Sequence, residues 1–147
     1  MEQSRVIRIA VLVVLLAALL PAPAPGAEER ADCHLCGMWI DLYTRTHHVA
    51  ELEDGTRVDF CSIACTARYL GKNAGHVRRV MAADFESTEL IPADEAVYLA
   101  GSDAPPVMTY TSRIAFSTRE RAEAFRATHG GRIITFQDAL DELDAEY

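Results

Sequence analysis

The sequence lacks the features of a nucleic-acid-binding protein and of a disulfide-rich scaffold. Its 147 residues carry 14 Lys and Arg against 22 Asp and Glu, a net charge of −8 that offers no basic surface to phosphate groups. The 4 cysteines fall well below the density of a disulfide scaffold. The sequence also shows no motif that pairs a nucleophile with a base, so we do not expect an enzyme. Hydrophobic residues make up 50%, which is enough for a packed core.

The N-terminal residues 1–27 have the three parts of a secretory signal. Two arginines precede the apolar run Ile9–Leu20, and a stretch of Pro, Ala and Gly follows it. The run is shorter than the about 20 residues that span a membrane. We expect cleavage after Gly26 or Ala27, export to an oxidising compartment, and contact with the membrane only through this segment. No lipid-attachment cysteine follows the run.

The densest group of metal-ligating side chains is the stretch Cys33-His34-Leu35-Cys36-Gly37-Met38. It places two thiols, an imidazole and a thioether within six residues. Thiolate and thioether together favour Cu(I), whereas thiolate with imidazole also suits Zn(II). Residue types alone therefore indicate a soft metal site without selecting the metal.

A second thiol pair, Cys61 and Cys65, lies at the start of a predicted helix. A spacing of four residues puts both on one helical face, and the helix N-terminus favours the thiolate. Together with Cys33 and Cys36 they could form a closed four-cysteine zinc site. In an oxidising compartment each pair could instead form a disulfide, or Cys33 and Cys36 a redox-active dithiol.

Two methionines are further candidate metal ligands. Met38 lies in a turn beside the thiols, and Met108 follows Pro105-Pro106 in a predicted loop. Methionine more often fills gaps in a core, but neither position suits a core residue. We therefore predict six metal-ligating residues: Cys33, Cys36, Met38, Met108, Cys61 and Cys65. The sequence leaves open whether Cys61 and Cys65 share one site with Cys33 and Cys36.

The pattern of apolar residues and turns predicts an α+β fold. It consists of two β-β-α-β units that form one compact two-lobed domain. The first half, residues 28–94, contains predicted strands 47–52, 56–60 and 76–82 and a predicted helix 62–70. The second half, residues 95–147, contains predicted strands 95–100, 113–116 and 132–136, a helix 118–128 and a closing helix 138–147. We expect Ser117 or Thr118 to cap the helix 118–128, with Glu120 in a capping box.

The two halves align as diverged copies when the first is shifted by 56 residues. The shift then aligns five chemically similar pairs: Arg57 with Arg113, Phe60 with Phe116, Tyr69 with Phe125, Gly75 with Gly131, and Val77 with Ile133. At the same shift Cys61 meets Ser117, and Cys65 meets Arg121. The second copy keeps the framework without thiols, which argues against a purely structural role for Cys61 and Cys65.

An ordered series of motifs resembles the NosL family, accessory proteins of nitrous oxide reductase that carry copper in the bacterial periplasm. The series comprises Cys33-x-x-Cys36-Gly37-Met38, Val80–Asp84, Ala96–Leu99, Met108, Ala122–Phe125 and His129-Gly130-Gly131. The resemblance covers most of the chain after the signal. Two departures are the missing lipid-attachment cysteine and the extra pair Cys61 and Cys65.

The resemblance implies a duplicated β-β-α-β fold and Cu(I) binding through Cys33, Cys36, Met38 and Met108. It implies delivery of copper to an enzyme client, nitrous oxide reductase or an assembly factor. We accordingly interpret the protein as an exported Cu(I) carrier. A zinc-stabilised interaction module is the alternative, and a C-x-x-C thiol-disulfide oxidoreductase ranks third.

Overall fold

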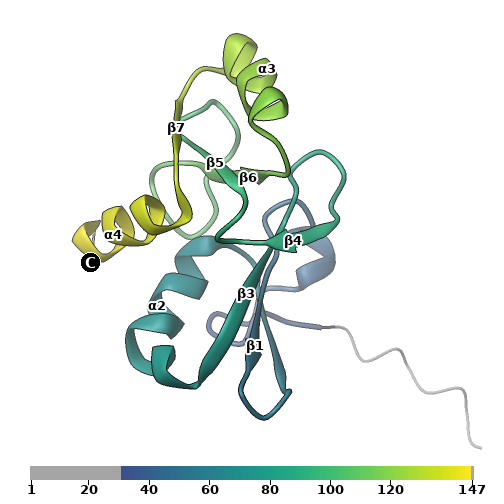
Figure 1. Cartoon of the computed structure of the whole chain (residues 1–147), viewed down its shortest axis with the longest axis vertical. Helices are drawn as coiled ribbons and strands as arrows, with labels where there is room; N and C mark the ends of the chain where they lie inside the picture. Colours follow the sequence, from purple (N-terminus) through teal and green to yellow (C-terminus); the bar gives the residue numbers. More distant parts are fainter. Residues whose placement is uncertain (1–30, 147) are drawn as a thin grey trace, which may run out of the picture.

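The structure is a computed structural model that describes residues 31–146 (Figure 1). The predicted export signal lies outside the described residues. In chain order the elements are η1 (Ile40–Leu42), β1 (His48–Leu52), β2 (Arg57–Phe60), α2 (Ile63–Asn73), η2 (Ala74–His76), β3 (Val77–Ala83), β4 (Leu90–Pro92), β5 (Val97–Ala100), β6 (Arg113–Phe116), α3 (Arg119–His129), β7 (Arg132–Ile134) and α4 (Phe136–Glu146). None of these helices is long and apolar enough to cross a membrane.

Two antiparallel sheets form the two lobes. The first has the strand order β2-β1-β3-β4 and the second the order β6-β5-β7. In each lobe the first strand is central, with its hairpin partner on one side and the strand after the helix on the other. Figure 1 shows the lobe of β5–β7 and α3 above that of β1–β3 and α2, with α4 beside α2. The prediction of an α+β fold with two β-β-α-β units is confirmed.

The internal repeat extends to the helices and to the aromatic contacts beneath them. α2 and α3 each have 11 residues, and both ends differ by the same 56 positions (119 − 63 and 129 − 73). Phe60 contacts Tyr69 at a ring-centroid distance of 5.1 Å, and Phe116 contacts Phe125 at 5.4 Å. Equivalent aromatic pairs therefore attach each helix to its own sheet.

Several details differ from the sequence prediction. The short edge strand β4 was not expected; Pro92 ends it, as suits a residue that cannot donate to a sheet. α2 continues beyond Gly71 to Asn73, whose side chain donates to the Tyr69 carbonyl. The side chain of Thr118 caps α3 by accepting a hydrogen bond from the Arg121 amide. Glu120 is therefore one residue short of the capping-box position, and that prediction was wrong.

The buried carboxylate of Asp84 fastens the end of the first sheet to the second lobe. Its oxygens accept hydrogen bonds from the amides of Glu86 and Ser87 at 3.0 and 2.9 Å and of Ser117 at 2.7 Å. Burial alone would raise the pKa of Asp84, but these hydrogen bonds lower it to about 2. The charged form therefore holds the start of α3 against the turn after β3.

A second link between the lobes is a buried histidine–tyrosine pair. His48 is 1% exposed; its Nδ1 lies 2.9 Å from the Thr46 carbonyl and its Nε2 lies 3.0 Å from the Tyr98 hydroxyl. Because a carbonyl only accepts, Nδ1 carries the proton and Nε2 accepts from Tyr98. Burial lowers the pKa of His48 to about 4.

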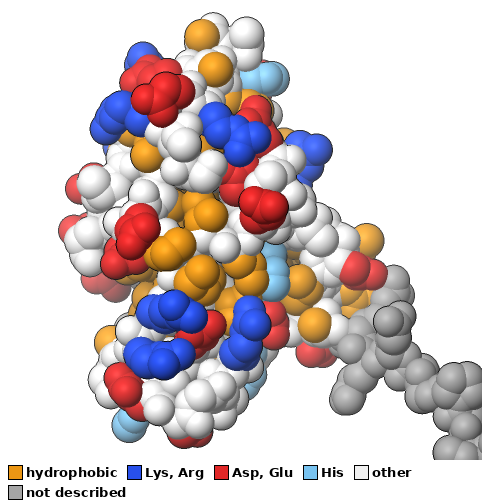
Figure 2. All heavy atoms as spheres, turned by 45° about the vertical axis from the view of Figure 1, so that its right-hand side comes forward, with side chains coloured by type: hydrophobic (Ala, Val, Ile, Leu, Met, Phe, Trp, Pro, Cys, Tyr) orange, Lys and Arg blue, Asp and Glu red, His pale blue; other side chains and the backbone are white. Residues whose placement is uncertain are grey.

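The main hydrophobic core also crosses the boundary between the lobes. It contains Ile63 and Val80 from the first lobe, Tyr98 and Ile134 from the second, and Leu143 of α4. On one face, hydrophobic side chains gather across the middle at the level of β4, with Lys and Arg side chains directly below (Figure 2). The lobes are therefore joined by apolar packing as well as by polar contacts.

We expect stability to fall as the pH drops from about 6.5 to 4. The unfolded chain binds a proton at His48 in this range, whereas the folded protein does not, since its pKa is about 4 rather than 6.5. That difference corresponds to about 3 kcal/mol. Urea unfolding between pH 7 and 4 measures it. The dependence should flatten in His48→Gln and persist in the control His76→Gln, which changes an exposed histidine. Equal pH dependence in both variants would contradict this account.

Candidate metal centre

The thiols of Cys33, Cys36, Cys61 and Cys65 converge on one point of the first lobe. Their Sγ atoms all lie within 4.8 Å of one another. The Cys36–Cys61 separation is 3.6 Å and the Cys61–Cys65 separation is 3.7 Å, and all four cysteines are free. A tetrahedral metal with bonds of about 2.3 Å to sulfur has sulfur–sulfur edges of about 3.8 Å. The four sulfurs thus have the spacing needed to hold a single metal ion.

A tight turn presents the first thiol pair. The amide of Cys33 donates to the Met38 carbonyl, and the amide of Gly37 donates to the Cys33 carbonyl, both at 2.8 Å. Gly37 has a φ of 74°, a conformation that favours glycine. The amide of His34 donates to the Asp59 carbonyl at 2.9 Å, which fixes the turn to β2.

The second pair lies where β2 passes into α2. Cys61 directly follows β2, and Cys65 lies in the first turn of the helix. The Thr46 hydroxyl donates to the Cys61 carbonyl at 2.7 Å, a buried contact that the sequence did not signal. In the second lobe the equivalent Ser117 and Arg121 side chains are hydrogen-bonded at 3.3 Å. The same junction therefore folds without thiols.

Burial and mutual hydrogen bonding make the four thiols unequal. Cys33, Cys61 and Cys65 are buried, whereas Cys36 is partly exposed. Hydrogen bonding with Cys65, and then with Cys36, lowers the pKa of Cys61 to about 6. Burial raises the pKa of Cys36 to about 11, and the bond to Cys61, together with burial, raises that of Cys65 well above its usual value. Hydrogen bonding within the cluster thus favours the thiolate form of Cys61, the form that binds metals.

Both candidate methionines pack against the apolar cluster that contains Cys33, Cys61 and Cys65. Met38 belongs to the turn of the first pair. Met108 comes from the second lobe, on the long connection between β5 and β6, and it also packs against the main core. The structure thus places both methionines against the apolar cluster that includes three of the cysteines; their role as ligands stays a prediction.

The histidines near the centre have other partners. The exposed His34 ring packs edge-on against Tyr69 at 5.6 Å between ring centroids. His47 bonds Asp59 at 2.7 Å between Nε2 and Oδ1, and His48 bonds Tyr98. Among the described residues, the group of His, Cys, Asp and Glu side chains that could hold a metal consists of the four cysteines.

Comparisons with known proteins agree with this architecture. The crystal structure of the copper chaperone NosL from Shewanella denitrificans is similar, with a TM-score of 0.60 and 24% sequence identity over 80% of this chain and 95% of that chain. This likeness supports the fold. No curated protein sequence matches.

The family comparison supplies the assignment. The sequence model of the NosL family matches residues 25–143, which includes all the described strands and the candidate metal centre. Because the match covers most of the 147 residues, the chain belongs to the NosL family.

Proposed function

We propose that this protein is a carrier that binds Cu(I) and releases it to a copper enzyme, and that it catalyses no reaction of its own. The observation that carries the proposal is the convergence of four cysteine sulfurs with Cys36 partly exposed. A carrier needs soft ligands to hold Cu(I) and an accessible ligand at which a partner can begin exchange. Cys36 meets the second need, while the three buried cysteines retain the metal.

The methionines support copper rather than zinc as the cargo. Met38 and Met108 pack against the apolar cluster that contains Cys33, Cys61 and Cys65, and they come from two different segments of the chain. Thioethers are ligands for Cu(I), whereas Zn(II) is bound by thiolate, imidazole and carboxylate. We therefore propose a site of Cys33, Cys36, Cys61 and Cys65 that one or both thioethers complete. The chain's NosL membership and its similarity to a copper chaperone support the same cargo.

A structural zinc site is the second candidate. The sulfur separations of 3.6 and 3.7 Å are close to the edges of a tetrahedral zinc–thiolate centre, so distance alone does not select between the metals. This candidate predicts a metal that stabilises the fold and does not exchange.

A thiol-disulfide oxidoreductase remains third. Cys33 and Cys36 lie in a turn before η1 rather than at the start of a helix that follows a strand, the context of thioredoxin-like sites. The same turn is well suited to presenting two thiols to a metal.

We further propose a periplasmic location and a copper-enzyme client, either nitrous oxide reductase or one of its assembly factors. The signal-like residues 1–27 support export, and the family resemblance supports this client. We do not propose nucleic acid as a partner, because a net charge of −8 would repel its phosphate groups.

An anaerobic competition titration tests the cargo. We expect the reduced mature protein to compete with a chromogenic chelator for Cu(I). The variant Met38→Ala should bind Cu(I) about 10-fold more weakly and bind Zn(II) unchanged, because only Cu(I) uses the thioether. Tight binding of one Zn(II) per chain, combined with no effect of Met38→Ala on either metal, would support the zinc module instead.

Serine substitutions test whether the second thiol pair belongs to the site. We expect Cys61→Ser and Cys65→Ser each to weaken Cu(I) binding by at least about 10-fold. The circular dichroism spectrum should stay that of a folded protein, because the second lobe forms the same junction without thiols. Ser117→Ala is the matched control in the other lobe. Unchanged Cu(I) affinity in both cysteine variants would remove this pair from the site.

The export prediction can be checked by expressing the full chain in a Gram-negative host. Mass spectrometry of the periplasmic fraction should find a protein that begins at Ala27 or Glu28, since small residues precede these positions. A variant with Arg5 and Arg8 changed to Glu should stay uncleaved. Retention of the full-length wild-type chain in the cytoplasm would contradict this prediction.

A further inference from the structure

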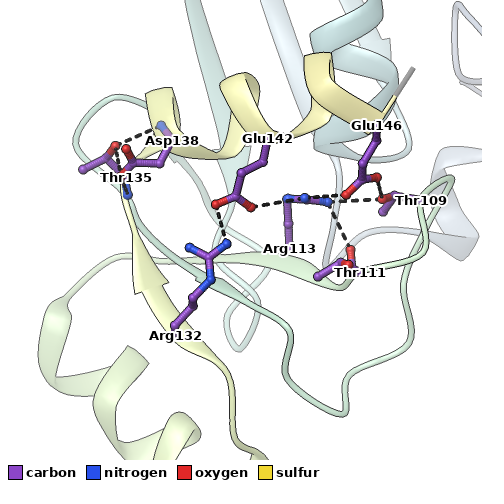
Figure 3. A network of polar contacts seen from close by, with 8 residues as sticks. All are labelled: Thr109, Thr111, Arg113, Arg132, Thr135, Asp138, Glu142 and Glu146. Atoms are coloured by element: carbon purple, nitrogen blue, oxygen red, sulfur yellow. Dashed lines mark hydrogen bonds and ion pairs between the residues drawn. The ribbon is translucent and has the colours of Figure 1, made fainter.

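A buried arginine joins α4 to the loop that carries Met108. The Arg113 side chain is 3% exposed. Its Nη2 donates to Glu146 at 2.6 Å and to Glu142 at 3.2 Å, and its Nη1 donates to the Thr109 hydroxyl at 3.1 Å (Figure 3). Two carboxylates from one helix thus offset a cation that burial would otherwise make costly.

Thr109 is bonded from two sides. Its hydroxyl donates to Glu146 at 2.7 Å while it accepts from Arg113. Burial alone would raise the pKa of Glu146, but the hydrogen bonds from Arg113 and Thr109 lower it. Arg113 also reaches the Thr111 carbonyl at 3.4 Å. The backbone that follows Met108 is therefore fixed to α4 by charge-assisted hydrogen bonds.

Met108 itself has a conformation that needs such support. Its φ is 58°, in the left-handed region that side chains other than glycine rarely adopt. Such strain persists only where surrounding contacts fix it, and it is frequent at functional sites. The next residue, Thr109, supplies such contacts. The Met108 side chain packs against the apolar cluster of the first lobe that contains Cys33, Cys61 and Cys65.

From this geometry we propose that Arg113, Glu146 and Thr109 are positioning residues. They hold the Met108 thioether against the four-cysteine centre and thereby raise its preference for Cu(I) over Zn(II). This inference rests on the proposed function. A thioether held in place adds a ligand that Cu(I) accepts and Zn(II) does not favour. The second lobe would then supply metal selectivity to a site whose thiols all belong to the first lobe.

The test compares Cu(I) and Zn(II) affinities in variants that keep side-chain shape. Glu146→Gln removes the charge, and Thr109→Val removes the hydroxyl. We expect each to weaken Cu(I) binding by about 10-fold, as Met108→Leu does, and to leave Zn(II) binding unchanged. Glu123→Gln is the matched control, since Glu123 pairs with Arg126 on the surface of α3. Thermal melting of the metal-free proteins verifies that each variant folds.

A double-mutant cycle and X-ray absorption separate positioning from a general structural effect. If Thr109 acts through Met108, the combined Met108→Leu and Thr109→Val variant loses no more Cu(I) affinity than Met108→Leu alone. The copper spectrum of Thr109→Val should show one sulfur ligand fewer than that of the wild type. Additive losses of Cu(I) affinity in the double variant, or equal losses for Cu(I) and Zn(II), would overturn the inference. Cu(I) affinities of Glu146→Gln and Thr109→Val that equal that of Glu123→Gln would also overturn it.

Failure of the proposed function would look different. A wild-type protein that cannot compete for Cu(I) would refute the carrier and this inference before any variant is made. A wild-type protein that binds Cu(I) tightly, with no change in Met108→Leu, would leave the carrier intact and refute only the positioning role.

Discussion

The convergence of four cysteine sulfurs at an apolar cluster is the constraint on which the rest of this structure depends. Hydrogen bonding with Cys65 and Cys36 lowers the pKa of Cys61 and so favours its thiolate. A buried anion without a cation is costly, so the cluster is suited to a soft metal ion. The turn of Cys33–Met38 and the β2–α2 junction both serve to bring the sulfurs within 4.8 Å of one another.

The two lobes have the same topology but carry different candidate ligands. The first carries the thiols at a strand–helix junction, and the second has Ser117 and Arg121 at the same positions. The second lobe instead has a long connection between β5 and β6, which places Met108 against the apolar cluster that contains Cys33, Cys61 and Cys65. Asp84 and the His48–Tyr98 pair fix the lobes together, so a side chain from one can act at the other.

This arrangement explains how a common zinc-like geometry can serve copper. The thiol separations fit either metal, and the difference lies in what surrounds them. In the proposed function, an accessible Cys36 permits ligand exchange, and thioethers beside the thiols favour Cu(I). Selectivity would then depend on contacts far along the chain from the thiols, at Arg113 and α4.

The sequence by itself determined the α+β class, the repeat and the thiol pairs, because these follow from local apolar periodicity, turn residues and short spacings such as Cys33-x-x-Cys36. It did not signal β4, whose three residues form a strand only by pairing with β3. Tertiary structure alone decided that the two thiol pairs lie together and that Met108 packs against the apolar cluster around them. It also decided that Arg113 joins the loop of Met108 to α4. These contacts join residues distant in sequence, and local patterns do not encode which distant segments pack together.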